Sequence, residues 1–248
     1  MKLLKTSLNM MYPKIVDYRR NFVLTEDVLK KDFQPANLLP VPDEIPDEVP
    51  RIVAQTKGGH SVLNIGLNAI SFLTNYDGSY VNDWTVSSSY LEEKSKLIYD
   101  VMDKLTGKRY SYVGVVAVLE FDNKNKDVLD ILKQSLIRDE GKGIGSPYSL
   151  GVKLTYVLED KYFINMSLET IKKYKAIKDK DGELISNTYD SSFIGITVDV
   201  NDRFAFEHIQ GYHSSQKAFE RILAIITELV DGKLEKLILE GRFVHCVE

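Results

Sequence analysis

A short acidic segment that follows the hydrophobic run of residues 112–121 provides the first side chains that could do chemistry. Glu120 and Asp122 are two positions apart, so a strand would place both carboxylates on one side. Asp199 ends a second hydrophobic run, in the segment TVDVND. Carboxylate oxygens hold Mg²⁺, which can activate water. The three residues define a candidate metal site of the nuclease type, and the alternative is two strand ends that enter polar turns.

A glycine-rich segment, GKGIGS at residues 141–146, could bind an anion. Closely spaced glycines let backbone N–H groups approach a phosphate, and Lys142, Gly143 and Gly145 would form the cradle. The dinucleotide fingerprint requires a strand before the glycines and a helix after them, and the order predicted here is the reverse. The alternative is therefore a flexible connector between a helix and a strand.

A third candidate is the basic segment IKKYKAIKDK at residues 171–180. Lys172, Lys173 and Lys175 surround Tyr174, so the lysines could contact phosphates while the tyrosine stacks on a base. The alternative is a solvated strand face whose lysines prevent edge-to-edge association.

The composition limits the classes of function. The 248 residues carry a formal charge of −4, which gives no global attraction to nucleic acid or to an anionic membrane. The single cysteine, Cys246, excludes an intrachain disulfide and favours a reducing compartment. No apolar run approaches the length of a membrane span. We therefore expect a cytoplasmic protein with no membrane association and no cofactor.

The chain divides at its prolines. Five of the seven prolines fall between residues 35 and 50, in an acidic stretch that should be extended and poorly paired. We predict an N-terminal arm and linker at residues 1–50, a first α+β half at 51–140 and a second at 141–248, which could also form one continuous domain. Within the arm, residues 15–24 read as a strand and residues 25–33 as a helical turn.

Hydrophobic periodicity predicts the elements of the first half. Residues 61–73 alternate as one strand, and Ser89 to Glu92 fits a capping box at the start of a helix that Gly107 ends. Residues 112–121 form a strand, and residues 127–140 form a second helix that Gly141 closes.

The second half begins with two alternating runs, at residues 152–158 and 164–168, which predict a hairpin. Residues 179–192 carry turn formers and charges and predict a loop. A strand at 193–200 precedes an amphipathic helix at 218–230, which ends at Gly232, and a shorter helix follows. This order predicts an α+β fold with a mixed, largely antiparallel sheet and amphipathic helices on one face. The two halves are candidates for distant repeats.

Several segments together resemble a sporadically distributed, uncharacterised family of prokaryotic proteins of about this length. The residues that carry the resemblance are VPRIVAQ, LNIGLNAISFLTNYDGSYVNDW, KRYSYVGVVAVLEF, LGVKLTYVLED, GITVDVND and SSQKAFERILAIITELV. Where that family has an Arg-Tyr-Ile-Asn type of strand, this chain has Val113-Gly114-Val115-Val116. The resemblance implies an accessory protein linked to a mobile element or to defence against phage, and it implies no catalytic residue.

The first functional hypothesis is a non-catalytic protein that binds another protein, or a second copy of itself, through a sheet face or edge. The alternative is a nucleic-acid-binding protein or a metal-dependent nuclease that uses the lysines around Tyr174 together with Glu120 and Asp122.

Overall fold

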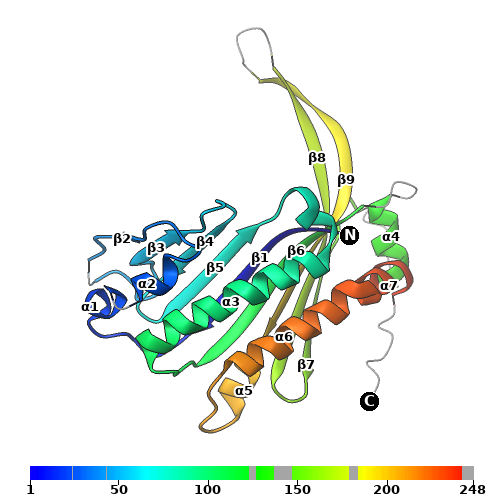
Figure 1. Ribbon diagram of the computed structural model, residues 1–248. Coiled ribbons are helices and arrows are strands. Elements are labelled where there is room, and N and C mark those ends of the chain that lie inside the picture. Colours follow the sequence, from blue (N-terminus) through cyan, green and yellow to red (C-terminus); the bar gives the residue numbers. More distant parts are fainter. Residues whose placement is uncertain (24, 43, 123–126, 137–146, 179–183, 242–248) are drawn as a thin grey trace.

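The structure of the chain is a computed structural model that describes residues 1–23, 25–42, 44–122, 127–136, 147–178 and 184–241 (Figure 1). The strands are β1 (Lys2–Met11), β2 (Asn37–Leu38), β3 (Ile52–Gln55), β4 (Ser61–Ile65), β5 (Ala69–Asn75), β6 (Tyr112–Phe121), β7 (Gly151–Leu158), β8 (Tyr162–Lys178) and β9 (Leu184–Asn201). The helices are α1 (Tyr18–Val23), α2 (Glu26–Leu29), η1 (Gly78–Asn82), α3 (Trp84–Thr106), α4 (Val128–Leu136), α5 (Arg203–His208), α6 (Gln216–Glu228), η2 (Leu229–Lys233) and α7 (Leu234–Glu240).

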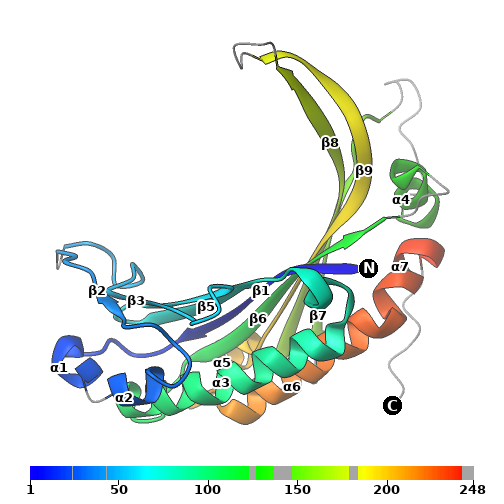
Figure 2. The ribbon, with the colours of Figure 1, turned by 45° about the horizontal axis from the view of Figure 1, so that its top comes forward.

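The described strands form one antiparallel sheet in the order β2-β3-β4-β5-β1-β6-β9-β8-β7. The sheet takes strands from all three predicted segments, and β1 lies between β5 and β6. The long helices α3 and α6 lie side by side on one face of the sheet (Figures 1 and 2). The predicted α+β class, with an antiparallel sheet and helices on one face, is confirmed.

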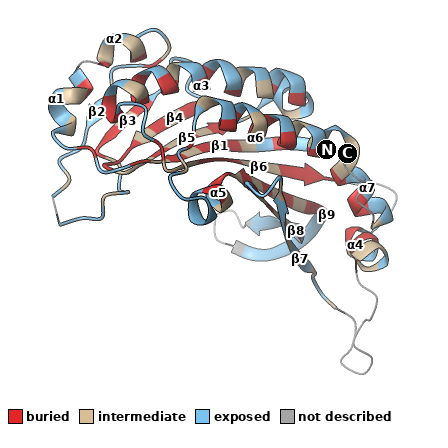
Figure 3. Cartoon of the chain, turned by 90° about the horizontal axis from the view of Figure 1, so that it is seen from below, coloured by how far each residue is buried: buried red, intermediate tan, exposed pale blue. Residues whose placement is uncertain are grey.

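The core lies between this helical layer and the sheet (Figure 3). Period-two alternation directs one side of each strand into it: Leu8 and Met10 of β1 are buried, whereas Ser7 and Asn9 face the other side. On α3 and α6 the buried residues recur at helical spacing, as at Leu91 and Ile98. The opposite face of the central sheet carries partly exposed residues, and the short helix α5 contacts it at one end, where the Phe204 ring packs edge-on against Phe163 and the Phe206 ring lies against Tyr112.

One prediction for the N-terminal region was wrong. Residues 15–23 do not form a strand, because Tyr18–Val23 is helical and its single buried side chain is Phe22, and residue 24 lies outside the described chain. Part of the predicted arm is also central to the sheet, since β1 exchanges backbone hydrogen bonds on both edges. The proline-rich stretch is mostly without regular structure, as predicted. It is held by the buried guanidinium of Arg51, which donates to the carbonyl oxygens of Val49 (2.8 Å) and Ile45 (3.0 Å).

Two boundaries in the first half also differ from prediction. Residues 61–73 form two strands rather than one, with a turn at Gly66–Asn68. A side chain at position 66 would meet the backbone oxygens of Asp47 and Glu48, at 2.7 and 2.8 Å. Helix α3 begins at Trp84 rather than after Ser89, because the Asp83 carboxylate accepts the Val86 N–H and caps the helix. Its end at Gly107, in the left-handed conformation, is confirmed.

The elements predicted for the second half are present in the structure except in one segment. The hairpin of β7 and β8, the strand around residues 193–200 and the helices at 218–230 and 234–240 are confirmed. The loop predicted at 179–192 is wrong for residues 184–192, which belong to β9, and residues 179–183 lie outside the described chain. In the part of the chain that the structure describes, no helix is long and apolar enough to cross a bilayer.

Candidate functional site

The three carboxylates of the predicted metal site lie apart. Glu120 is opposite Gly195 in the pairing of β6 with β9, whereas Asp199 is opposite Val116. Four residues of strand separate these positions, which is about 13 Å at about 3.3 Å per residue. Asp122 follows the end of β6 and is exposed. Within the described ranges, no three His, Cys, Asp or Glu side chains gather into a metal-binding group.

Glu120 is instead bound to one of the predicted nucleic-acid-binding lysines. It is 9% exposed, and its carboxylate accepts a hydrogen bond from Lys173 Nζ at 3.1 Å. Lys2 Nζ lies 3.8 Å from the other carboxylate oxygen. The Lys173 ammonium also lies 4.3 Å from the centroid of the Phe193 ring. These contacts tie β8 to β6 across β9, at the point where β8 and β9 leave the sheet.

Tyr174 and Lys172 lie on the other side of β8, with Tyr148. The Tyr148 and Tyr174 hydroxyls are 2.6 Å apart, and Lys172 Nζ is 3.4 Å from the Tyr148 ring centroid. Tyr189, opposite Tyr174 on β9, completes the group with an edge-on ring contact at 6.1 Å. The hydrogen bond to Tyr148 raises the pKa of Tyr174. This cluster of three tyrosines and one lysine presents aromatic surface to solvent.

The predicted lysines do not form one basic patch. Alternation places Lys173 and Lys175 on the side of β8 opposite Lys172, and Lys175 Nζ pairs with Asp190 at 2.5 Å. Two of the three lysines therefore have acidic partners. Lys142, Gly143 and Gly145, predicted as an anion cradle, lie outside the described residues, as does Cys246.

Several exposed large apolar side chains gather on the outer part of the β8–β9 hairpin, which we call the ribbon: residues 171–178 of β8 and 184–193 of β9. Strand β7 flanks β8 only as far as Glu169, and β6 flanks β9 only from Ile194. Beyond these points, and within the described residues, the two strands form ladder pairs only with each other and extend away from the sheet (Figures 1 and 2). The exposed fractions of its large apolar side chains are Ile171 39%, Tyr174 48%, Ile177 45%, Ile185 65% and Tyr189 54%.

Asp199 belongs to a polar row on the face of the sheet away from the helices. Its carboxylate accepts hydrogen bonds from the side-chain amides of Asn201 (3.0 Å) and Asn165 (3.3 Å). Asn165 in turn accepts from the Thr155 hydroxyl at 3.0 Å. A shallow hollow of about 380 Å³ opens beside this row and extends to Arg203 and Glu207 of α5. The Asp199 carboxylate is thus held by one amide of its own strand, Asn201, and one of the neighbouring strand β8, Asn165.

Sequence reasoning missed Tyr148 and Tyr189 as partners of Tyr174, and Glu120 as the partner of Lys173. Tyr148 precedes β7 and Tyr189 lies in the segment predicted to be a loop. The register of β8 against β9 brings Tyr189 opposite Tyr174, and the pairing of β7 with β8 brings Tyr148 alongside. An extension of the hairpin prediction through residues 171–178 would have found Tyr189, because β-branched and aromatic residues continue on both sides of the turn.

The fold and these contacts define an α+β protein whose antiparallel sheet carries the long helices α3 and α6 on one face and extends into a projecting two-stranded ribbon. A comparison of the chain with models of known protein families finds no match, and a comparison with curated protein sequences finds none either.

Proposed function

We propose that the chain is a binding protein of the cytoplasm that recognises another protein through the ribbon. The observation that carries the proposal is the exposure of Ile177, Ile185 and the Tyr174–Tyr189 pair on two strands that, in the described part of the chain, have only each other as ladder partners there. An isolated two-stranded hairpin is at best marginally stable in water. Exposed apolar groups gathered on one element are typical of interaction sites. A partner packed against the ribbon would bury these apolar side chains and would stabilise the two-stranded hairpin.

The root of the ribbon supports this proposal. The Lys173–Glu120 ion pair and the contact of Lys173 with Phe193 fix the hairpin to the sheet at its base. The Cδ1 atom of Ile171 lies 2.4 Å from the position that a Cβ at Gly195 would take, so the glycine lets this side chain lie against β9, and a larger residue would displace its end. A ribbon fixed at its root holds its apolar side chains in a defined direction, which lowers the entropy that binding has to overcome.

The tyrosine cluster favours a second candidate, single-stranded nucleic acid. Tyr148 and Tyr174 offer rings on which bases could stack, and Lys172 offers a charge. The charges favour a protein partner over nucleic acid, because Glu120 and Asp190 neutralise two of the three lysines, Lys173 and Lys175. Affinity for nucleic acid depends mainly on unpaired cationic groups and falls steeply with salt.

The test compares three forms of the protein as bait in extracts of the native host: wild type, Ile177→Asp/Ile185→Asp, and the matched control Val16→Asp. Val16 is 74% exposed and lies outside the ribbon. We expect a partner captured by wild type and the control, and lost by the ribbon variant. The partner is then purified, and its dissociation constant is measured for all three forms. Circular dichroism confirms that the variants are folded.

Equal affinity of the purified partner for all three forms would count against the ribbon as the binding surface. The nucleic-acid candidate is tested with a fluorescent oligo-U RNA at low and high salt. Salt-sensitive binding that Tyr174→Ala and Lys172→Ala abolish, without any captured protein, would replace the proposal with the second candidate.

A further inference from the structure

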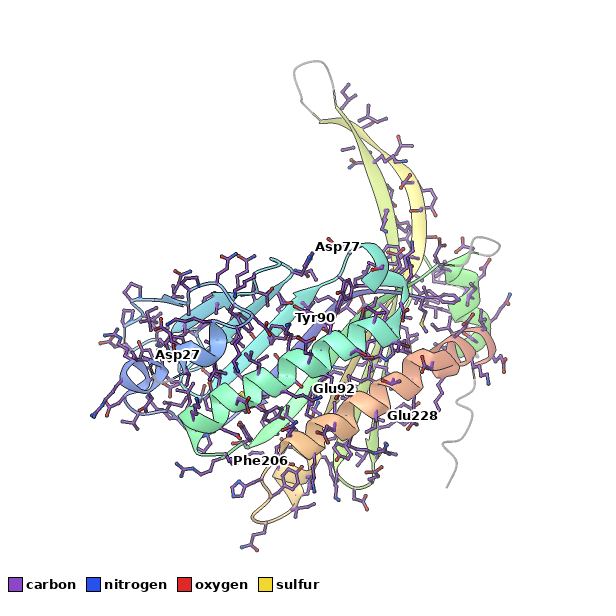
Figure 4. The ribbon with its side chains drawn as sticks, in the orientation of Figure 1. Asp27, Asp77, Tyr90, Glu92, Phe206 and Glu228 are labelled. Atoms are coloured by element: carbon purple, nitrogen blue, oxygen red, sulfur yellow. The ribbon has the colours of Figure 1, made fainter. Side chains whose placement is uncertain are left out.

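A small aromatic cavity, separate from the ribbon, lies between the end of β5, η1 and the first turns of α3. Its volume is about 80 Å³, and three of its lining residues are tyrosines, Tyr76, Tyr80 and Tyr90. His60, Thr74, Asn75 and Asp77 complete the lining. Figure 4 labels Asp77, just after β5, and Tyr90, on α3.

The three rings are neighbours and two are fixed by their hydroxyls. The Tyr76 and Tyr80 centroids are 6.2 Å apart with an interplanar angle of 29°, and those of Tyr80 and Tyr90 are 6.0 Å apart at 71°. The Tyr76 hydroxyl is hydrogen-bonded to Thr6 Oγ1 at 2.9 Å, and the Tyr90 hydroxyl to Ser61 Oγ at 2.8 Å. The hydroxyls are thus held by polar partners that do not line the cavity, and the carbon surfaces of the rings are left to line it.

The electrostatics of this cavity favour a cation. The faces of aromatic rings carry negative potential and attract ammonium groups, most effectively when several rings surround the charge. Asp77 adds a carboxylate at the rim, where its side chain is 74% exposed and lies 3.8 Å from Nδ1 of His60, which also lines the cavity. Burial is the main cause that raises the pKa of Tyr76 to about 12, so this phenol stays neutral at physiological pH.

Tyr90 already has one ammonium nearby. Lys94 Nζ lies 5.4 Å from the Tyr90 ring centroid and pairs with Asp32 and Glu93, each at 2.9 Å. The two carboxylates balance its charge, so Lys94 does not oppose a second cation on the cavity side. Lys94 itself does not line the cavity.

The size of the cavity selects the kind of cation. A protein cavity of about 150 Å³ holds benzene, with six heavy atoms. By proportion, about 80 Å³ suits a group of about three heavy atoms, which is close to the size of a methylated ammonium head of three or four heavy atoms. We propose that Tyr76, Tyr80 and Tyr90 form an aromatic cage that binds a methylated ammonium group, with Asp77 at its entrance. This site is independent of the proposed protein binding by the ribbon.

The test uses choline and its uncharged isostere 3,3-dimethylbutan-1-ol, which has the same shape. Binding to the full chain is measured by saturation-transfer NMR and by titration of tyrosine fluorescence. We expect saturable choline binding and at least tenfold weaker binding of the neutral alcohol. Tyr80→Leu should weaken choline binding about tenfold, whereas Tyr80→Phe, which keeps the ring, should stay within about twofold.

Tyr80 is suited to this test because its side chain is 36% exposed, so both variants should fold, as thermal unfolding will confirm. Equal binding of choline and the alcohol would show an apolar pocket and overturn the proposal. So would the absence of any choline binding at tens of millimolar, or a Tyr80→Leu variant that binds choline as tightly as wild type.

Discussion

Lys173 Nζ and Glu120 Oε2 are 3.1 Å apart, and this ion pair joins the root of the ribbon to the end of β6. The two partners differ in exposure: the Glu120 side chain is 11% exposed and that of Lys173 is 49% exposed. Loss of the lysine therefore leaves a largely buried carboxylate with Lys2 as the remaining cation, at 3.8 Å. The pair stabilises the base of the ribbon through an ionic contact between two residues that are 53 positions apart in the sequence.

A double-mutant cycle measures this contact. Lys173→Met, Glu120→Gln and the double variant are compared with wild type by urea unfolding. We expect a coupling free energy of about 1 kcal/mol, because the pair is half exposed and screened on its lysine side. A matched cycle on Lys96 and Glu92, an exposed pair on α3 at 2.9 Å, should give about 0.3 to 0.5 kcal/mol. A Lys173–Glu120 coupling no larger than that of the control would contradict the prediction.

Removal of the outer ribbon should leave the rest of the fold intact. Lys173 and Ser191 are opposite each other, so a two-residue Asn-Gly turn can replace residues 174–190. The free energy of unfolding should change by less than about 0.5 kcal/mol, because the described residues of the removed segment form ladder pairs only with one another and the bond of Tyr174 to Tyr148 is exposed. Chemical denaturation of both forms checks this. A loss above about 2 kcal/mol would mean that the ribbon supports the core.

Truncation of Leu8 to alanine should destabilise the protein strongly, because β1 is central to the sheet. Leu8 is 1% exposed, whereas Leu4 on the same strand is 36% exposed and provides the matched control. We expect Leu8→Ala to lower the free energy of unfolding by about 2 to 5 kcal/mol and Leu4→Ala by less than about 1 kcal/mol. Similar losses in the two variants, measured by urea unfolding, would argue against a central position for this strand.

Asp202 gives the stability of the fold a defined pH dependence. Burial is the main cause that raises the pKa of its carboxyl, opposed by hydrogen bonds from Ser214, Tyr212 and the Val113 N–H. Between the ordinary and the raised pKa, the folded protein holds a proton that the unfolded chain has lost. The free energy of unfolding therefore falls as pH rises through this interval.

Asp202→Asn has no such proton. The stability of wild type relative to this variant should fall as pH rises from about 3.8 through the raised pKa, and should be constant above it. Urea unfolding of both proteins at a series of pH values gives the comparison, in which contributions from other carboxyls cancel. A stability difference that does not vary with pH, or one that moves in favour of wild type as pH rises, would show that folding does not raise the pKa of the Asp202 carboxyl.

Elements with strong local patterns could be predicted from the sequence. The buried stripe of α6, the glycine end of α3 and the alternation in β6 all follow from neighbouring residues. Strand β1 was missed because a bulge between Leu3 and Lys5 interrupts its alternation. The turn at Gly66 was missed because the period-two pattern continues through it, and its cause is the distant backbone at Asp47 and Glu48.

The candidate sites depended more heavily on long-range pairing. The polar character of residues 184–192 indicated a loop, yet β8 provides a partner strand for every residue but two from 184 to 192. Lys173 and Glu120 were assigned to different kinds of site because nothing local connects positions 53 residues apart. The tyrosines of the aromatic cavity come from β5, η1 and α3, and their convergence depends on how α3 packs on the sheet.

The central place of β1 also has a consequence for the chain as it leaves the ribosome. Leu3 pairs with Leu119 of β6, so one edge of β1 has no neighbour until more than 100 further residues have been made. At about 5 to 20 residues per second, that wait lasts roughly 5 to 20 seconds. During this time Leu8 and Met10 lack their cross-strand neighbours Val115 and Val113, so the segment stays available to a nascent-chain chaperone.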